Sequence, residues 1–103
     1  MNYKIIIHPE AAQDIKALDH AVQLLVFKQF KKISQTPFIG VQLGNKMGMD
    51  LSGYRKIYVD KKRIRIVYKI FEERILIQII AVGKREGMNV YQKASKRTQT
   101  DPA

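Results

Sequence analysis

Residues 54–82 read YRKIYVDKKRIRIVYKIFEERILIQIIAV, and this stretch decides the fold. It holds three apolar runs rich in β-branched residues, and two short polar segments separate them. Runs of this kind are typical of strands, and short polar separations between them are typical of hairpin turns. The sequence therefore predicts an antiparallel meander of three strands at Tyr54–Val59, Arg63–Phe71 and Ile75–Val82, with turns at Asp60-Lys61-Lys62 and Glu72-Glu73.

Upstream of the meander, the pattern predicts one strand and two helices. The Ile-rich run Tyr3–Ile7 predicts a short strand, and Pro9 suits the first turn of a helix. Apolar residues then recur at helical spacing over residues 10–18 and again over residues 21–33. Because the link between them is very short, the two helices are expected to form an antiparallel hairpin whose apolar stripes face one sheet. The outer face of the second helix carries Lys28, Lys31 and Lys32.

The remaining segments contain less regular patterns. Phe38–Gly53 has three glycines and neither a helical nor a strand period, so it is expected to be a loop. It lacks the spacing of a phosphate-binding glycine loop, which favours a plain connection. After Gly83, a short last helix is expected with Met88, Tyr91 and Ala94 or Ser95 on one face.

Together these elements predict a single α+β domain over residues 1–95, followed by a flexible tail over residues 96–103. The expected architecture is an antiparallel sheet of about four strands packed on the N-terminal helical hairpin. The element order is β-α-α-β-β-β-α, with a short C-terminal helix.

Composition limits the partners and the compartment. The 103 residues hold 19 Lys and Arg against 9 Asp and Glu, a formal charge of +10, and no cysteine. Disulfides and thiolate metal sites are thereby excluded, and a reducing cytoplasm is the expected location. The longest apolar stretches are shorter than the roughly 20 residues that a membrane span needs, and no secretion signal is expected. The charge predicts a polyanionic partner: nucleic acid, an anionic membrane surface or an acidic protein.

Strand alternation separates two faces of the meander. With Lys61-Lys62 and Glu72-Glu73 as two-residue turns, eight residues would point toward the core: Ile64, Ile66, Tyr68, Ile70, Ile75, Ile77, Ile79 and Ala81. The opposite face would carry Lys56, Tyr58, Arg63, Arg65, Val67 and Lys69, with Tyr58 directly across from Arg65. Cations on a strand face are often only solvated. The addition of two tyrosines, Tyr58 and Tyr91, favours single-stranded RNA, because such RNA is bound by aromatic stacking together with phosphate pairing.

Two motifs resemble one toxin family. They are RIRIVY at residues 63–68 and AVGKREGMNVY at residues 81–91, where the family shows a "yRivY" strand and a "VGkRe…vY" ending. Over nearly its whole length the chain resembles the RelE branch of the RelE/ParE toxins of bacterial toxin–antitoxin systems. The resemblance implies a ribosome-dependent mRNA endoribonuclease that uses neither metal nor cofactor, with catalytic residues Lys56, Arg65, Arg85 and Tyr91. It also implies that Lys69 and Lys84 help to hold RNA, as Tyr58 and Arg63 on the basic face are expected to do.

The implied reaction is attack by a ribose 2′-hydroxyl on the adjacent phosphate. Arg65 and Arg85 suit stabilisation of the phosphorane because arginine keeps its charge. Lys56 is a candidate general base, if the neighbouring arginines lower its pKa. Tyr91 and Tyr58 are each candidates to position a base or to act as general acid. The family carries a lysine where this chain has Tyr58, so the assignment of the proton transfers stays open.

Catalysis by histidine and catalysis by a bound metal ion are both less well supported by the sequence. His8 ends the first strand and His20 lies at the link between the helices, so both are expected to be structural or solvated. A metal site is not expected, because Glu72 and Glu73 occupy a turn and Glu86 is surrounded by cations.

The resemblance also implies the partners and the alternatives. An acidic antitoxin is expected to cover the basic site, and the substrate would be mRNA in the ribosomal A site, aligned by ribosomal RNA. One alternative keeps the fold but inhibits DNA gyrase, as ParE relatives do, although their chains generally lack this Lys, Arg, Arg, Tyr set. A second alternative is a non-catalytic RNA- or ribosome-binding module.

Overall fold

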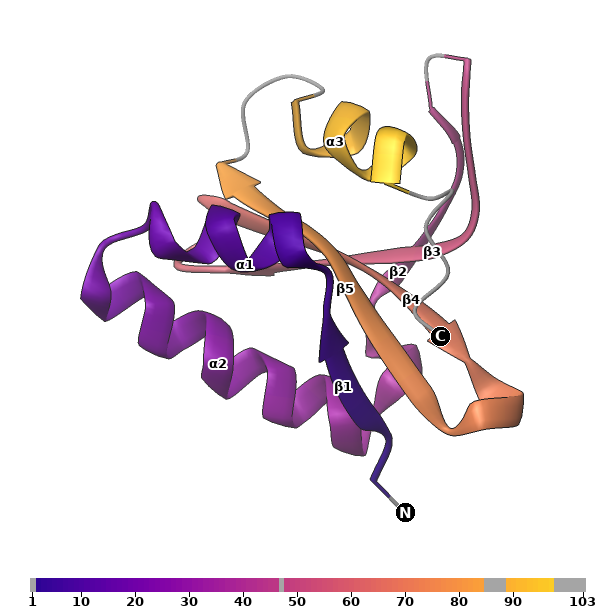
Figure 1. The fold of residues 1–103 in the computed structure, drawn as a ribbon, viewed down its shortest axis with the longest axis horizontal. Helices are drawn as coiled ribbons and strands as arrows, with labels where there is room; N and C mark the ends of the chain where they lie inside the picture. Colours follow the sequence, from indigo (N-terminus) through magenta and orange to yellow (C-terminus); the bar gives the residue numbers. More distant parts are fainter. Residues whose placement is uncertain (1, 47, 85–88, 98–103) are drawn as a thin grey trace.

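The fold is known from a computed structural model, which describes residues 2–46, 48–84 and 89–97. Five strands form one sheet in the order β1-β5-β4-β3-β2, in which β1 is parallel to β5 and all other neighbours are antiparallel. Helices α1 and α2 lie on one side of this sheet and α3 lies on the other (Figure 1). The elements are β1 (Lys4–Ile7), α1 (Pro9–Lys16), α2 (His20–Gln35), η1 (Pro37–Ile39), β2 (Val41–Lys46), β3 (Met49–Val59), β4 (Ile64–Phe71), η2 (Glu72–Arg74), β5 (Leu76–Lys84) and α3 (Asn89–Arg97).

The α+β class and the helical hairpin are confirmed. Apolar residues of α1 and α2 pack on one face of the sheet and form the main core. His8 precedes α1, and its Nδ1 accepts a hydrogen bond from the Glu10 backbone N–H, so this buried histidine caps the helix. No helix in the described ranges has both the length and the apolar character needed to cross a bilayer.

The expected loop at Phe38–Gly53 is wrong, and so is the count of about four strands. This segment holds most of η1, all of β2 and the first part of β3, and β2 is the fifth strand of the sheet. Three of its residues, Gly44, Gly48 and Gly53, have φ angles of 72°, 82° and 84°. Left-handed glycines let the two strands bend and turn, but they also interrupt the alternation by which a strand is recognised.

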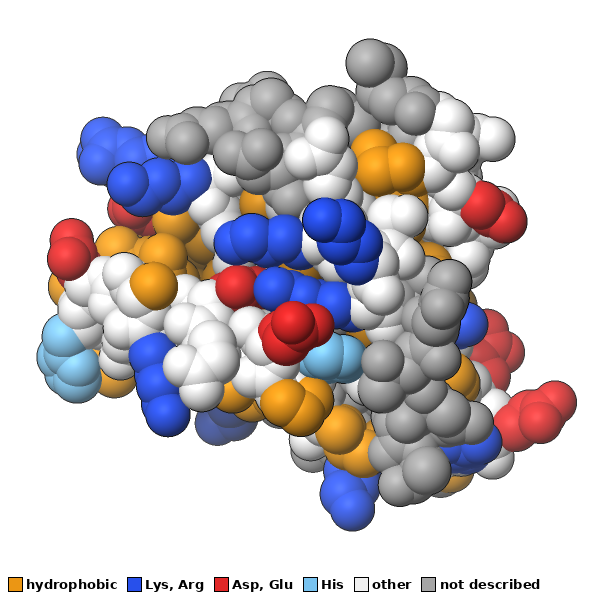
Figure 2. Space-filling model, turned by 45° about the horizontal axis from the view of Figure 1, so that its top comes forward, with side chains coloured by type: hydrophobic (Ala, Val, Ile, Leu, Met, Phe, Trp, Pro, Cys, Tyr) orange, Lys and Arg blue, Asp and Glu red, His pale blue; other side chains and the backbone are white. Residues whose placement is uncertain are grey.

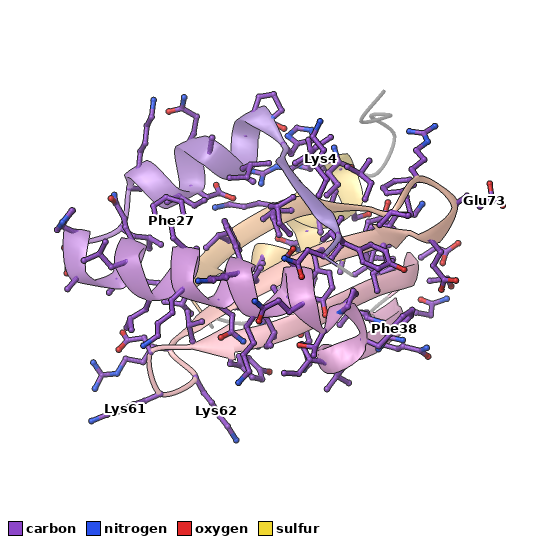
Figure 3. The ribbon with its side chains drawn as sticks, turned by 90° about the horizontal axis from the view of Figure 1, so that it is seen from below. Lys4, Phe27, Phe38, Lys61, Lys62 and Glu73 are labelled. Atoms are coloured by element: carbon purple, nitrogen blue, oxygen red, sulfur yellow. The ribbon has the colours of Figure 1, made fainter. Side chains whose placement is uncertain are left out.

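The β3–β4 hairpin has the predicted register. Val59 pairs with Ile64 and Tyr58 with Arg65. The turn itself is unusual, because Asp60, Lys61 and Lys62 all have positive φ angles, of 52°, 53° and 69°. The two lysines project from the tip of the hairpin (Figure 3).

The β4–β5 hairpin differs from the prediction. Its turn is longer than Glu72-Glu73, since η2 is followed by Ile75 in the left-handed region with φ 51°. Ile75 is therefore 39% exposed in the turn and not part of the core. A bulge between Val67 and Tyr68 reverses the expected face of Ala81, which points with Val67 toward α3.

The face opposite the main core is partly apolar, which corrects the prediction of a mainly basic surface. A second, smaller core lies between this face and α3. Its buried members are Leu43, Leu51, Tyr54, Val67, Ile80, Ala81, Val90, Tyr91 and Ala94.

Buried ionic contacts join α3 to α1. Arg97 Nη1 lies 2.7 Å from Asp14 Oδ2 and also donates to the Ile80 carbonyl at 2.8 Å. Asp14 Oδ2 further accepts from the Val82 backbone N–H. On the face in Figure 2, basic side chains gather near the centre directly beside acidic ones. Helix α3 continues to Arg97, beyond the predicted domain end at residue 95. The rest of the predicted tail, residues 98–103, lies outside the described part of the chain and stays a prediction.

Gly40 lies where no side chain fits. A Cβ at this position would come within 2.5 Å of the Tyr68 hydroxyl and 2.8 Å of the Lys56 carbonyl oxygen. The Tyr68 hydroxyl is fixed there, because it accepts from the Gly40 N–H and donates to the Pro37 carbonyl. We expect Gly40→Ala to lower the free energy of unfolding by about 1–3 kcal/mol, as overpacking does in a filled core.

Urea denaturation of the variant and of the wild-type protein measures this difference. The double variant Gly40→Ala/Tyr68→Phe, compared with Tyr68→Phe alone, removes the hydroxyl contact and leaves those with the ring carbon Cε1 and the Lys56 carbonyl oxygen. Unchanged stability of the single variant would contradict the close approach of these segments.

Candidate active site

Four of the predicted residues gather on the α3 side of the sheet, and we call Lys56, Tyr58, Arg65 and Tyr91 the basic-aromatic cluster. Lys56 and Tyr58 are alternate residues of β3 and share a face, and Arg65 of β4 pairs with Tyr58. Tyr91 comes from α3. Lys56 Nζ lies 3.0 Å from the Tyr58 hydroxyl oxygen, within hydrogen-bond distance. The strand register thus brings together three of these side chains, and the docking of α3 adds the fourth.

Cations and rings alternate within the cluster. The Arg65 guanidinium carbon lies 4.5 Å from the centre of the Tyr91 ring and 5.7 Å from that of Tyr58. Lys56 Nζ lies 5.1 Å from the Tyr58 ring centre and 6.0 Å from that of Tyr91. All four separations are within or near the range of cation–π attraction. The rings therefore hold both cations in defined positions.

The four side chains differ in access to solvent. Arg65 is 7% exposed and Tyr91 is 3% exposed, whereas Lys56 and Tyr58 are partly exposed. Tyr91 also belongs to the second core. A molecule that approaches this face of the described structure therefore meets Lys56 and Tyr58 first.

The expected lowering of the Lys56 pKa is wrong. The hydrogen bond with Tyr58 raises the pKa of Lys56, burial opposes this effect, and Tyr91 adds to it. The same hydrogen bond lowers the pKa of Tyr58, and Arg65 contributes in the same direction. At neutral pH, Lys56 is thus held in its protonated form, which suits a cation or a proton donor and not a general base.

The other predicted residues lie apart from the cluster. Lys69 contacts two rings farther along the face, with its Nζ 5.1 Å from the ring centres of both Tyr54 and Phe71. Arg63 and Lys84 line a separate hollow of about 630 Å³ beside the link between α1 and α2. Arg63 was predicted on the basic face, but it lies in the turn before β4, where the strand alternation does not apply. Arg85 lies outside the described residues.

A groove beside Tyr58 was missed. It has a volume of about 390 Å³ and lies between α2 and the end of β3, with Lys28, Lys31, Lys32 and Tyr58 in its lining. The helical spacing had placed these lysines on one outer face of α2. Only the packing of α2 shows that this face lies beside Tyr58 at the end of β3.

Comparisons with known proteins identify the family. The family described as the ParE toxin of type II toxin–antitoxin system, parDE, matches residues 5–88. The chain belongs to the RelE/ParE superfamily of toxins. A protein of Escherichia coli described as a RelE-like toxin is 33% identical to this family member over 100 residues, and the match covers 94% of this chain and 98% of the relative. The mRNA interferase toxin RelE of Escherichia coli (strain K12) is 28% identical over 97 residues, with the same coverage.

Solved structures support this assignment. A double mutant of the Escherichia coli toxin RelE in the free state is 26% identical, with a TM-score of 0.74 over 94% of this chain and 98% of that one. The same mutant in complex with an antitoxin RelBc peptide is 25% identical, with a TM-score of 0.70 over 91% and 95% of the two chains. This member of the superfamily thus has the RelE-like fold.

The histidines of this RelE/ParE chain lie outside the cluster. His8 is buried as the cap of α1, and His20 is exposed at the start of α2. Within the described ranges, no three His, Cys, Asp or Glu side chains come close enough together to hold a metal ion.

Proposed function

We propose that this chain is a ribosome-dependent mRNA endoribonuclease, the mRNA interferase of a type II toxin–antitoxin system, and that it inhibits translation in the cytoplasm. The observation that carries this proposal is the basic-aromatic cluster. Two cations and two phenols from β3, β4 and α3 lie in mutual contact on one face. The 28% identity with an mRNA interferase over nearly the whole chain supports it.

The proposed reaction needs no metal. A ribose 2′-oxygen attacks the neighbouring phosphorus, the bond to the 5′-oxygen breaks, and the products are a 2′,3′-cyclic phosphate and a free 5′-hydroxyl. The phosphorane formed on the way carries extra negative charge, which fixed cations stabilise. Arg65, held against the ring of Tyr91, suits this task, and Arg85 is proposed to join it. The buried ring of Tyr91 packs against the Arg65 guanidinium and holds it in position.

The ribosome has a defined part in the proposal. Lys56 and Tyr58 are the accessible members of the cluster, and the lysines of α2 continue the positive surface beside Tyr58. Such a surface attracts RNA but does not align a scissile phosphate by itself. Ribosomal RNA around the A site is proposed to hold the message in the reactive geometry. Arg63, Lys69 and Lys84 are proposed to contact RNA phosphates outside the cluster.

An acidic antitoxin is the proposed partner. The chain has a formal charge of +10, and a similar RelE toxin has been solved with an antitoxin peptide. An acidic segment that folds on the toxin would neutralise the basic face and keep RNA away from it. Co-expression with the neighbouring gene product tests this partner, and we expect a small acidic protein to co-purify.

The central experiment compares two substrates. Purified protein is incubated with programmed ribosomes and with the same transcript free in solution, and the new 5′-hydroxyl ends are mapped. We expect cleavage at defined positions in the A site and little cleavage of free RNA. Efficient cleavage of the free transcript at many sites would contradict dependence on the ribosome. Ribosome binding without new ends would instead indicate a non-catalytic binding module.

A second candidate is inhibition of DNA gyrase. The observation that favours it is the match of residues 5–88 to the ParE toxin family. Gyrase supercoiling measured in the presence of the protein separates the two candidates. Inhibition of supercoiling without cleavage of mRNA on ribosomes would replace the proposal above.

A further inference from the structure

On the basis of the proposed endoribonuclease activity, we infer that Lys56 and Tyr58 form a proton relay. The Tyr58 phenolate takes the proton of the attacking 2′-hydroxyl, and the Lys56 ammonium gives a proton to the departing 5′-oxygen. Tyr58 is then a catalytic residue, and its role extends beyond contact with RNA.

The geometry of β3 brings the two groups together. Lys56 and Tyr58 project from the same face of one strand, and their polar ends lie 3.0 Å apart. A proton can cross such a hydrogen bond directly. Arg65 lies across from Tyr58 in the paired strand and holds a positive charge near its ring, 5.7 Å from the ring centre.

The pair is accessible from the outer edge of the sheet. The pairing of β2 with β3 reaches Lys56 through Val41, and Tyr58 lies two residues beyond this point. There it borders the groove lined by the lysines of α2. The other phenol of the cluster, Tyr91, is almost fully buried. The relay thus uses the two most accessible members of the cluster in the described structure.

The electrostatics support the assigned roles. An ordinary tyrosine has a pKa near 10 and is almost entirely protonated at neutral pH. The hydrogen bond from Lys56, assisted by Arg65, lowers the pKa of Tyr58 and increases the phenolate fraction. The same contact raises the pKa of Lys56 and keeps its ammonium protonated. Each group is therefore biased toward the form that the relay needs.

The protons balance over one turnover. The 2′-oxygen forms a bond to phosphorus and loses its proton to the Tyr58 phenolate. The bond from phosphorus to the 5′-oxygen breaks, and this oxygen takes a proton from Lys56. The pair is left as a neutral phenol and a neutral amine, and transfer of the phenol proton to Lys56 Nζ restores the starting phenolate and ammonium. No additional reactant is consumed.

The test uses three variants in single-turnover cleavage of mRNA on programmed ribosomes. Tyr58→Phe keeps the ring and removes the hydroxyl, and we expect the rate to fall about 10²–10⁴-fold, the usual contribution of a general base. Lys56→Arg keeps the charge but supplies a group that does not release its proton, so a similar loss is expected. Tyr3→Phe is the matched control for loss of a phenol hydroxyl, because Tyr3 packs against the main core, and its rate should equal that of the wild type.

A modified substrate separates the two roles. With sulfur in place of the 5′-bridging oxygen, the leaving group is a thiolate and needs no proton. We expect this substrate to restore most of the rate of Lys56→Arg but not that of Tyr58→Phe. The wild-type rate should also rise with pH below the pKa of Tyr58, as the phenolate fraction increases, and Tyr58→Phe should lose this rise.

Three results would contradict the relay, and they distinguish its failure from that of the proposed function. If the wild-type protein cleaves mRNA on ribosomes while Tyr58→Phe stays within about threefold of it, less than general-base catalysis contributes, the relay is wrong and the proposed function stands. A Lys56→Arg enzyme that the sulfur substrate does not rescue would overturn the role of Lys56 as proton donor. If the wild-type protein does not cleave mRNA on ribosomes, the proposed function fails and the relay fails with it.

Discussion

Arg65→Ala should lower the rate of mRNA cleavage on ribosomes about 10²–10³-fold, the usual cost of removing one fixed group that stabilises a charged transition state. Arg65 is held near the rings of Tyr58 and Tyr91 and is almost fully buried. A charge fixed in this way needs no reorganisation when the phosphorane forms. Water that replaces the guanidinium would have to reorient, and this raises the barrier.

The measurement is the single-turnover rate at saturating protein, with ribosome binding measured separately. Arg74→Ala is the matched control, because Arg74 is an exposed arginine in η2, at the opposite end of β4 from Arg65, and its guanidinium lies beside the Phe71 ring. We expect its rate to stay near that of the wild type. A circular dichroism melt verifies that Arg65→Ala is folded. A folded Arg65→Ala protein that cleaves at the wild-type rate would contradict the catalytic role of Arg65.

Asp14→Ala should lower the free energy of unfolding by about 3–5 kcal/mol, the range seen when one partner of a buried ion pair is removed. Asp14 and Arg97 side chains are 8% and 9% exposed, and their closest atoms are 2.7 Å apart. The substitution leaves the Arg97 charge without its buried partner and removes the acceptor of the Val82 N–H. Since domains of this size are stable by about 5–15 kcal/mol, this loss is a large share of the total.

Glu10→Ala is the matched control, since it removes a second acidic partner of the same arginine. The Glu10 side chain is 65% exposed and lies 3.3 Å from Arg97 Nε. Exposed pairs contribute about 0–1 kcal/mol, so only a small loss is expected. Urea denaturation compares the two variants. Equal losses would show that burial of the Asp14 pair does not determine its contribution.

The prediction of the fold was most accurate where the alternation of side chains allows one register between neighbouring strands. The register of β3 against β4 follows from alternation, because a shift by one residue would bury Arg65 in the main core. The prediction was wrong at β2, where glycines with positive φ angles break the alternation. It was also wrong for Ala81, because a bulge reverses a face and leaves no clear mark in the pattern.

For the candidate site as well, some features could be predicted from the sequence and others could not. The amino-acid sequence alone was sufficient to predict that Lys56, Tyr58 and Arg65 share a face, because neighbouring strands are held together by local hydrogen bonds of regular spacing. The motif around Tyr91 pointed to the toxin family, to which the chain belongs. Composition and periodicity likewise determined the charge and the two helices of the hairpin.

Only the tertiary structure decided how α3 seats Tyr91 against Arg65, and that the lysines of α2 border Tyr58. It also decided the direction of the Lys56 pKa shift, which is opposite to the one expected from neighbouring cations. The physical reason is that these properties depend on distances between segments far apart along the chain, or on which of several neighbours comes within hydrogen-bond range. Periodicity defines the faces of each element, whereas packing selects the contacts between them.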